Sequence, residues 1–191
     1  MTSVSVVENR GRMHPHKFLL WIGIASIVML FAGLTSAYIV KRSFANWLEF
    51  PLPKIFWLST CVILISSLTM HLALKAFKAH ERKRYRLLIT LTAALGVAFA
   101  LLQLYGFITL EHRGIHIFGT GSNASASFLG VITIVHAVHV IGGVVALLIM
   151  FFRAFRKRVK RYDATPVEIA AIYWHFVDIL WIYLFIFFSL N

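Results

Sequence analysis

The chain has 191 residues, of which 60% are hydrophobic, and its formal net charge is +12. So apolar a composition excludes an ordinary soluble domain and indicates a membrane protein. The basic residues lie almost wholly between apolar runs, where such charge orients membrane spans, so we expect no nucleic-acid partner.

Five apolar runs reach the length of about 20 residues that a helix needs to cross a bilayer. In chain order they cover residues 18–40, 55–74, 87–110, 127–152 and 169–190. Lipid requires every backbone polar group to be satisfied internally, which runs of this composition achieve as helices. We therefore predict an all-α, polytopic membrane protein. Residues 1–17 form an N-terminal segment, and residues 18–190 form a single five-helix transmembrane domain. The one cysteine, Cys61, excludes a disulfide framework.

The connections between the runs predict the direction of the spans. With the N-terminus in the cytoplasm, 15 of the 19 Lys and Arg residues fall on the cytoplasmic side. Such a bias follows the positive-inside rule. We expect a cytoplasmic N-terminus and a C-terminus outside.

Small residues recur within the runs at the spacing of helix contacts, which lets neighbouring backbones approach closely. The pairs are Gly33 and Ala37, Ala94 and Ala98, Gly96 and Ala100, and Gly142 and Ala146.

Five ionisable side chains lie within the predicted spans: His71, His136, His139, His175 and Asp178. A carboxylate at the bilayer centre costs roughly 2.5–3.5 kcal/mol on insertion scales, so Asp178 needs a partner or a role. His136 and His139 are three residues apart, as are His175 and Asp178, so each pair lies on one helix face. A rise of about 1.5 Å per residue places His136, His139 and Asp178 near the midplane.

Three interpretations of these residues compete. In the first, Asp178 and the histidines hydrogen-bond one another and fix the packing of the last two helices. In the second, histidines ligate haem as in a b-type cytochrome. Two ligands of one iron must approach from opposite sides, which an i,i+3 pair on one helix does not allow. In the third, His175 and Asp178 relay protons, although the first span has no ionisable residue to continue a path.

The last span resembles that of a known family, subunit III of the haem-copper terminal oxidases, which includes cytochrome c oxidase. The stretch YWHFVDILW at 173–181 matches the signature of the family's last helix. Its signature residues are Tyr173, Trp174, His175, Phe176, Asp178 and Trp181. The preceding span is similar in its two histidines, His136 and His139, with Gly142 after them, and in its end at Phe151-Phe152-Arg153. The resemblance extends from about residue 18 to residue 190.

This resemblance implies the five-helix bacterial form of an accessory subunit in the inner membrane, part of the aerobic respiratory chain. Such a chain has no catalytic residue and no cofactor or metal ligand of its own. Haem and copper belong to partner subunits I and II, and phospholipid is bound. The subunit stabilises subunit I and supports proton-coupled oxygen reduction, and a larger respiratory supercomplex is left open. A quinol oxidase or a nitric-oxide-reductase-associated relative is the alternative function, and a b-type cytochrome the second alternative.

Two departures from the family pattern argue against proton conduction through this chain. Many members carry a glutamate in the first span a few positions before Gly33, where this chain has Ala25-Ser26-Ile27-Val28. Members also often have an acid where this chain has Gly106. A separate hypothesis concerns Arg153, which ends the fourth span at the interface, where a guanidinium can bind a lipid phosphate.

Overall fold

The computed structural model describes residues 15–43, 53–112, 114, 124–155 and 164–190. It contains five helices: α1 (Pro15–Arg42), α2 (Ile55–Lys78), α3 (Arg82–His112), α4 (Ala124–Phe155) and α5 (Thr165–Leu190). Each is long and apolar enough to cross a membrane, so the prediction of five apolar helices is confirmed. Each also extends beyond its predicted apolar run at one or both ends. A helix gains a backbone hydrogen bond with every added residue, so it need not stop where the lipid does.

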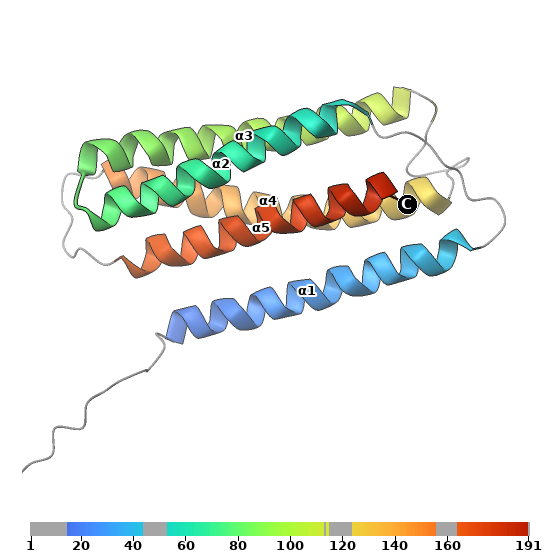
Figure 1. Ribbon diagram of the computed structural model, residues 1–191, viewed down its shortest axis with the longest axis horizontal. Helices are drawn as coiled ribbons and strands as arrows, with labels where there is room; N and C mark the ends of the chain where they lie inside the picture. The colour runs from blue at the N-terminus through green and yellow to red at the C-terminus, as the bar shows by residue number, and fades with distance from the viewer. Residues whose placement is uncertain (1–14, 44–52, 113, 115–123, 156–163, 191) are drawn as a thin grey trace, which may run out of the picture.

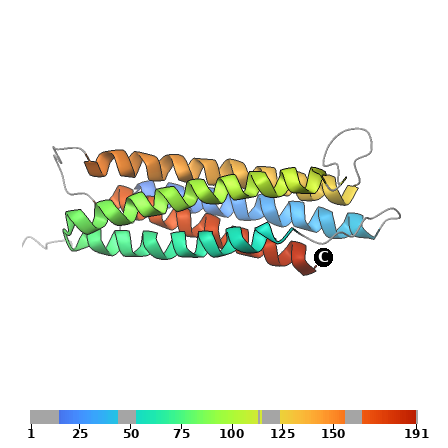
Figure 2. The same cartoon turned by 90° about the horizontal axis from the view of Figure 1, so that it is seen from above.

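The helices run along one common axis (Figures 1 and 2). The start of α1 and the end of α5 lie at opposite ends of the bundle, as five alternating passes require (Figure 1). The end that carries the start of α1 also carries the turn between α2 and α3. We name it the basic end, because Lys17, Lys78 and Arg86 lie there. Its assignment to the cytoplasm stays a prediction.

The turn between α2 and α3 reverses the chain within three residues. His80 adopts a φ of 59°, the left-handed conformation that typically closes a helix C-terminus. The amide of Glu81 donates to the Ala76 carbonyl at 3.0 Å, and the amide of His80 donates to the Phe77 carbonyl at 3.1 Å. These two bonds form a Schellman motif, which satisfies the last carbonyls of α2 and lets α3 pack antiparallel to it.

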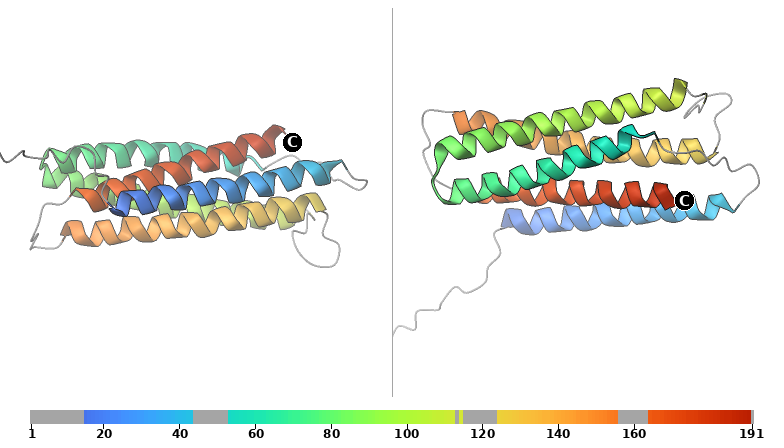
Figure 3. Two further views of the ribbon diagram at one scale, coloured as in Figure 1. Left: turned by 90° about the horizontal axis from the view of Figure 1, so that it is seen from below. Right: turned by 45° about the horizontal axis from the view of Figure 1, so that its top comes forward.

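Two apolar clusters hold the bundle together. The larger one joins α2, α3, α4 and α5, and its most buried members include Ile63, Met70, Phe99, Leu147 and Trp174. The smaller one attaches α1 to α4 and α5 through Phe31 and Tyr38. Helix α1 therefore lies at the edge of the bundle, as Figure 3 shows. Many large apolar side chains, such as Met29 at 76% exposure, cover the outer surface, as expected for helices in lipid.

The predicted small-residue contacts are only partly right. A Cβ atom at Gly96 would lie 2.8 Å from the Trp174 ring, so this glycine does allow close packing. Around Gly33 nothing lies within 4 Å of such an atom, so the expected contact is absent among the described residues. On α4 the tightest contact falls on Gly143 rather than on Gly142, because Gly143 faces Trp174.

Candidate functional site

The signature residues lie in the middle of α5, and α5 has the largest buried share of the five helices. Helix α5 contacts α2, α4 and α1. Its two indole rings and its imidazole all reach polar groups of α2.

Trp174 is fully buried and joins three helices to α5. Its indole Nε1 donates to the Ser66 hydroxyl of α2 at 3.1 Å. Its ring lies over Gly96 of α3 and Gly143 of α4, where added Cβ atoms would come within 2.8 and 2.9 Å of ring carbons. Only glycine fits beneath the ring at both places. Trp174 therefore fixes the spacing between α5 and its neighbours.

His175 is half-buried and faces α2. Its Nδ1 shares a hydrogen bond of 2.7 Å with the Ser67 hydroxyl, in which either atom can donate. The imidazole of His71, exposed on α2, lies 6.3 Å from it between ring centroids. His71 is thus the histidine that approaches His175.

Asp178 is 1% exposed, and neither of its carboxyl oxygens has a hydrogen-bond partner among the described residues. The Ser67 hydroxyl lies nearby, but its hydrogen bond goes to His175. A carboxyl in such surroundings is more stable in its neutral form, because burying an unpaired charge raises the free energy of the folded protein.

Trp181 lies one helical turn beyond Asp178, where the polar residues end and aromatic rings pack together. Its Nε1 donates to the Thr60 hydroxyl of α2 at 3.1 Å. Phe99 packs edge-on against it with a centroid distance of 5.4 Å, and His136 stacks on it at 5.4 Å.

The imidazole rings of the two α4 histidines do not bond to the polar side chains of α5, although the Tyr173 hydroxyl of α5 donates to the backbone carbonyl of His139 at 3.1 Å. His136 is 1% exposed, and its nitrogens have no hydrogen-bond partner among the described residues. It packs between Trp181 and Phe31 of α1, 6.3 Å away between centroids. His139 bonds through Nδ1 to the Val135 carbonyl of its own helix at 2.7 Å.

The four residues His136, His139, His175 and Asp178 were predicted to hydrogen-bond one another. Within the described part of the chain they form no such bonds, contrary to the prediction. Each imidazole has closer neighbours: an aromatic ring, a backbone carbonyl or a serine. The side-chain hydrogen bonds between α5 and α2 instead use the hydroxyls of Ser66, Ser67 and Thr60.

Sequence reasoning missed Glu168, which lies at the basic end of α5. Its carboxylate pairs with Lys17 of α1 at 2.5 Å and with Lys78 of α2 at 2.6 Å. It thus joins three helices that are distant in sequence. Glu168 lies seven residues before His175, which places both on one face of the helix. This spacing could have identified Glu168 as a member of the same polar face.

Comparison with known proteins decides the family. The sequence model for cytochrome c oxidase subunit III matches residues 16–190. The chain belongs to the cytochrome c oxidase subunit III family. It is 32% identical over 176 residues to the cytochrome c oxidase subunit 3 of Bacillus sp. strain PS3, covering 89% of this chain and 83% of that protein. It is 31% identical over 188 residues to the cytochrome c oxidase subunit 3 of Synechocystis sp., covering 91% of this chain and 76% of that protein.

The resemblance predicted from the sequence is thus confirmed, and so is the function. This subunit III is a multi-pass membrane protein of a respiratory cytochrome c oxidase complex and has partner subunits there. The family lacks metal centres, and the catalytic centre lies outside subunit III. The alternative of a b-type cytochrome, with haem bound by the membrane histidines, is therefore wrong for this family.

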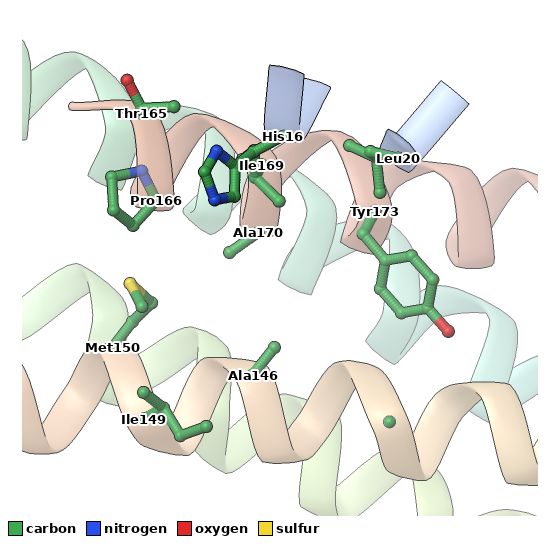
Figure 4. A pocket seen from close by; sticks show the side chains of 11 residues that line it. His16, Leu20, Ala146, Ile149, Met150, Thr165, Pro166, Ile169, Ala170 and Tyr173 are labelled. Atoms are coloured by element: carbon green, nitrogen blue, oxygen red, sulfur yellow. The ribbon is translucent and has the colours of Figure 1, made fainter. Parts of the chain in front are cut away.

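Subunit III also has a cavity of about 570 Å³ between α1, α4 and α5. Apolar side chains line most of it, and His16 and Tyr173 supply polar atoms (Figure 4). A second space of about 420 Å³ shares His16 and Tyr173 with it and extends along α1. Helix α1 is therefore loosely packed near the basic end. There Lys17 holds it to Glu168.

Proposed function

We propose that this chain is a cofactor-free accessory subunit that packs beside subunit I of the oxidase and stabilises it. Haem and copper are held by subunits I and II, and subunit I reduces oxygen. The main support for this proposal is that the signature residues form hydrogen bonds within the bundle. Trp174, His175 and Trp181 each bond to a hydroxyl of α2, so these three signature side chains hold α5 against α2 within the bundle.

The proposal includes the orientation inferred from the sequence, with the basic end in the cytoplasm. Lys17, Lys78 and Arg86 at that end agree with the positive-inside rule. Single cysteines test it: exposed Lys83 replaced by cysteine, in a background without Cys61, should react with an impermeant maleimide only in inverted vesicles. Reaction in right-side-out vesicles would reverse the orientation.

Purification of the complex tests the accessory role. A tagged chain extracted in mild detergent should co-elute with subunits I and II, as mass spectrometry would show. When subunit I is stripped away, the remaining chain should have no Soret absorption. A Soret band that stays with the isolated chain, or elution without oxidase subunits, would refute the proposal.

We also propose that the cavity between α1 and α4 holds the acyl chain of an anionic phospholipid whose phosphate binds Arg153. Arg153 is exposed at the end of α4. It lies three and four residues after Met150 and Ile149, which line the cavity, and so shares their helix face. A guanidinium can hold a phosphate with two hydrogen bonds.

The lipid content of the purified complex tests this site. Arg153→Gln should lower the number of anionic phospholipids that co-purify with the complex. Lys83→Gln removes an exposed charge from the start of α3, at the same end of the bundle, and should leave that number unchanged. An equal lipid count in both variants rejects Arg153 as a head-group ligand.

A further inference from the structure

Polar side chains follow the contact between α2 and α5 from the basic end to the middle of the bundle. At the basic end the Lys78 ammonium pairs with the Glu168 carboxylate at 2.6 Å. Further in, the His71 and His175 rings lie 6.3 Å apart, and Ser67 bonds His175 at 2.7 Å. The last member is Asp178. We name this set the polar seam: Lys78, Glu168, His71, His175, Ser67 and Asp178.

Helix geometry explains why these residues meet. On α2 the seam residues are spaced by seven and four positions, and on α5 by seven and three, so each set lies along one face. The two helices are antiparallel, so the members pair in order from the basic end inward. Glu168 and Asp178 are ten residues apart, about 15 Å along the axis. The seam thus covers about half of a hydrocarbon layer of about 30 Å.

Access along the seam decreases from one end to the other. His71 is exposed, His175 and Ser67 are half-buried, and Asp178 is 1% exposed. Beyond Asp178 the way is blocked by the Trp181 ring, which packs against Phe99 and also against Phe56 at 6.0 Å. The seam is therefore most exposed toward the basic end, where the Lys78 side chain is 53% exposed, and it ends at a buried carboxyl.

We propose that the polar seam lets Asp178 exchange a proton with the aqueous phase at the basic end. A proton from water at the basic end reaches His71 and passes to His175. The Ser67 hydroxyl accepts a proton from His175 and gives its own to the Asp178 carboxylate, which becomes a neutral acid. The reverse sequence returns the proton to water, and no net charge crosses the membrane.

The neighbouring helices add few titratable groups to this path. From α4, His136 stacks on Trp181, which lies one turn beyond Asp178, and the His139 ring is bonded to its own helix. From α1, Lys17 reaches Glu168 at the entrance. That the exchanged protons are cytoplasmic rests on the proposed orientation. The path itself does not depend on it.

Infrared spectroscopy of the purified oxidase complex tests the proposal. Transfer to D2O shifts the carbonyl band of a protonated carboxyl, and Asp178→Asn identifies which band belongs to Asp178. Asp178→Glu, which keeps the carboxyl and moves its band, assigns it if the asparagine variant fails to assemble. We expect Ser67→Ala to slow the deuterium shift about tenfold or more, which corresponds to an added barrier of only about 1.4 kcal/mol.

Two comparisons separate exchange through the seam from a purely structural effect. Ser67→Thr keeps the hydroxyl and should restore the exchange rate. His139→Phe, which changes an imidazole outside the seam, should leave the rate as it is in the unmodified complex. If Ser67 were only structural, its loss would loosen the seam and speed exchange. Equal or faster exchange in Ser67→Ala overturns the proposal, as does the absence of a protonated-carboxyl band for Asp178. Co-elution of subunits I and II is measured separately. If it fails, the same infrared comparison is made on the tagged chain in detergent, so that failure affects only the proposed function.

Discussion

Replacing Gly96 by alanine tests whether Trp174 sets the spacing of the bundle. The new Cβ atom would lie 2.8 Å from Cη2 and 3.0 Å from Cζ2 of the indole, and 3.6 Å from a methyl of Val144. The indole cannot move freely, because it is fully buried and its Nε1 bonds to Ser66. The clash therefore has to displace a helix or break that bond.

The expected effect is a loss of stability. Inserting a methyl group into a packed core costs about 1–3 kcal/mol, and losing the indole hydrogen bond costs about 1 kcal/mol more. Alanine is the better helix former by about 1 kcal/mol, which offsets part of this. We expect Gly96→Ala to destabilise the subunit by about 1–3 kcal/mol, measured as a lower midpoint of heat-induced aggregation of the tagged chain in detergent.

Two variants sharpen this test. Gly23→Ala makes the same chemical change where nothing lies within 4 Å, so its midpoint should stay or rise. Combining Gly96→Ala with Trp174→Phe should cost less than the two changes added together, because the smaller ring leaves room for the methyl group. If Gly96→Ala behaves like Gly23→Ala, or the double variant is strictly additive, Trp174 does not fix the helix spacing.

Three further changes test other contacts by the same aggregation midpoint. Ser66→Ala leaves the buried indole N–H without its acceptor and should cost about 1–3 kcal/mol, whereas no change would mean that this bond is dispensable. Glu168→Gln removes both ion pairs at the basic end and should cost about 1 kcal/mol or less at low salt and nothing at high salt. Glu81→Gln, which removes the exposed ion pair of Glu81 with Arg84 three residues along the chain, is its control. Phe31→Ala should loosen α1 by about 3–5 kcal/mol, whereas Met29→Ala, on the exposed face, should have little effect.

The sequence predicted the five helices and the family because both signals are local. An apolar run of sufficient length specifies a membrane helix by itself, and the stretch YWHFVDILW lies within one helix. The helix ends were less accurate, as α3 shows by starting at Arg82 rather than at 87. Polar flanks extend a helix without leaving an apolar signal.

The contacts between helices were harder to predict, because they depend on how each helix is rotated. Gly142 and Gly143 are adjacent, and only the rotation of α4 decides that Gly143 meets Trp174. The ion pairs of Glu168 join it to Lys17, 151 residues away, and to Lys78. Spacing along one helix could not identify such partners.

The hydrogen bonds of α5 explain why the most polar signature of this chain lies in its most buried helix. In lipid, burial of apolar surface does not drive helices together, so association depends on close packing and on bonds between polar groups. Helix α5 meets both needs, through the fit of Trp174 on two glycines and through three bonds to the hydroxyls of α2. The contacts of α1 with the bundle include a hydrogen bond between Thr35 and Tyr183 of α5, aromatic contacts of Phe31 and Tyr38, and the ion pair of Lys17 with Glu168. We therefore expect α1 to be the helix whose position depends most on neighbouring lipids and partner subunits.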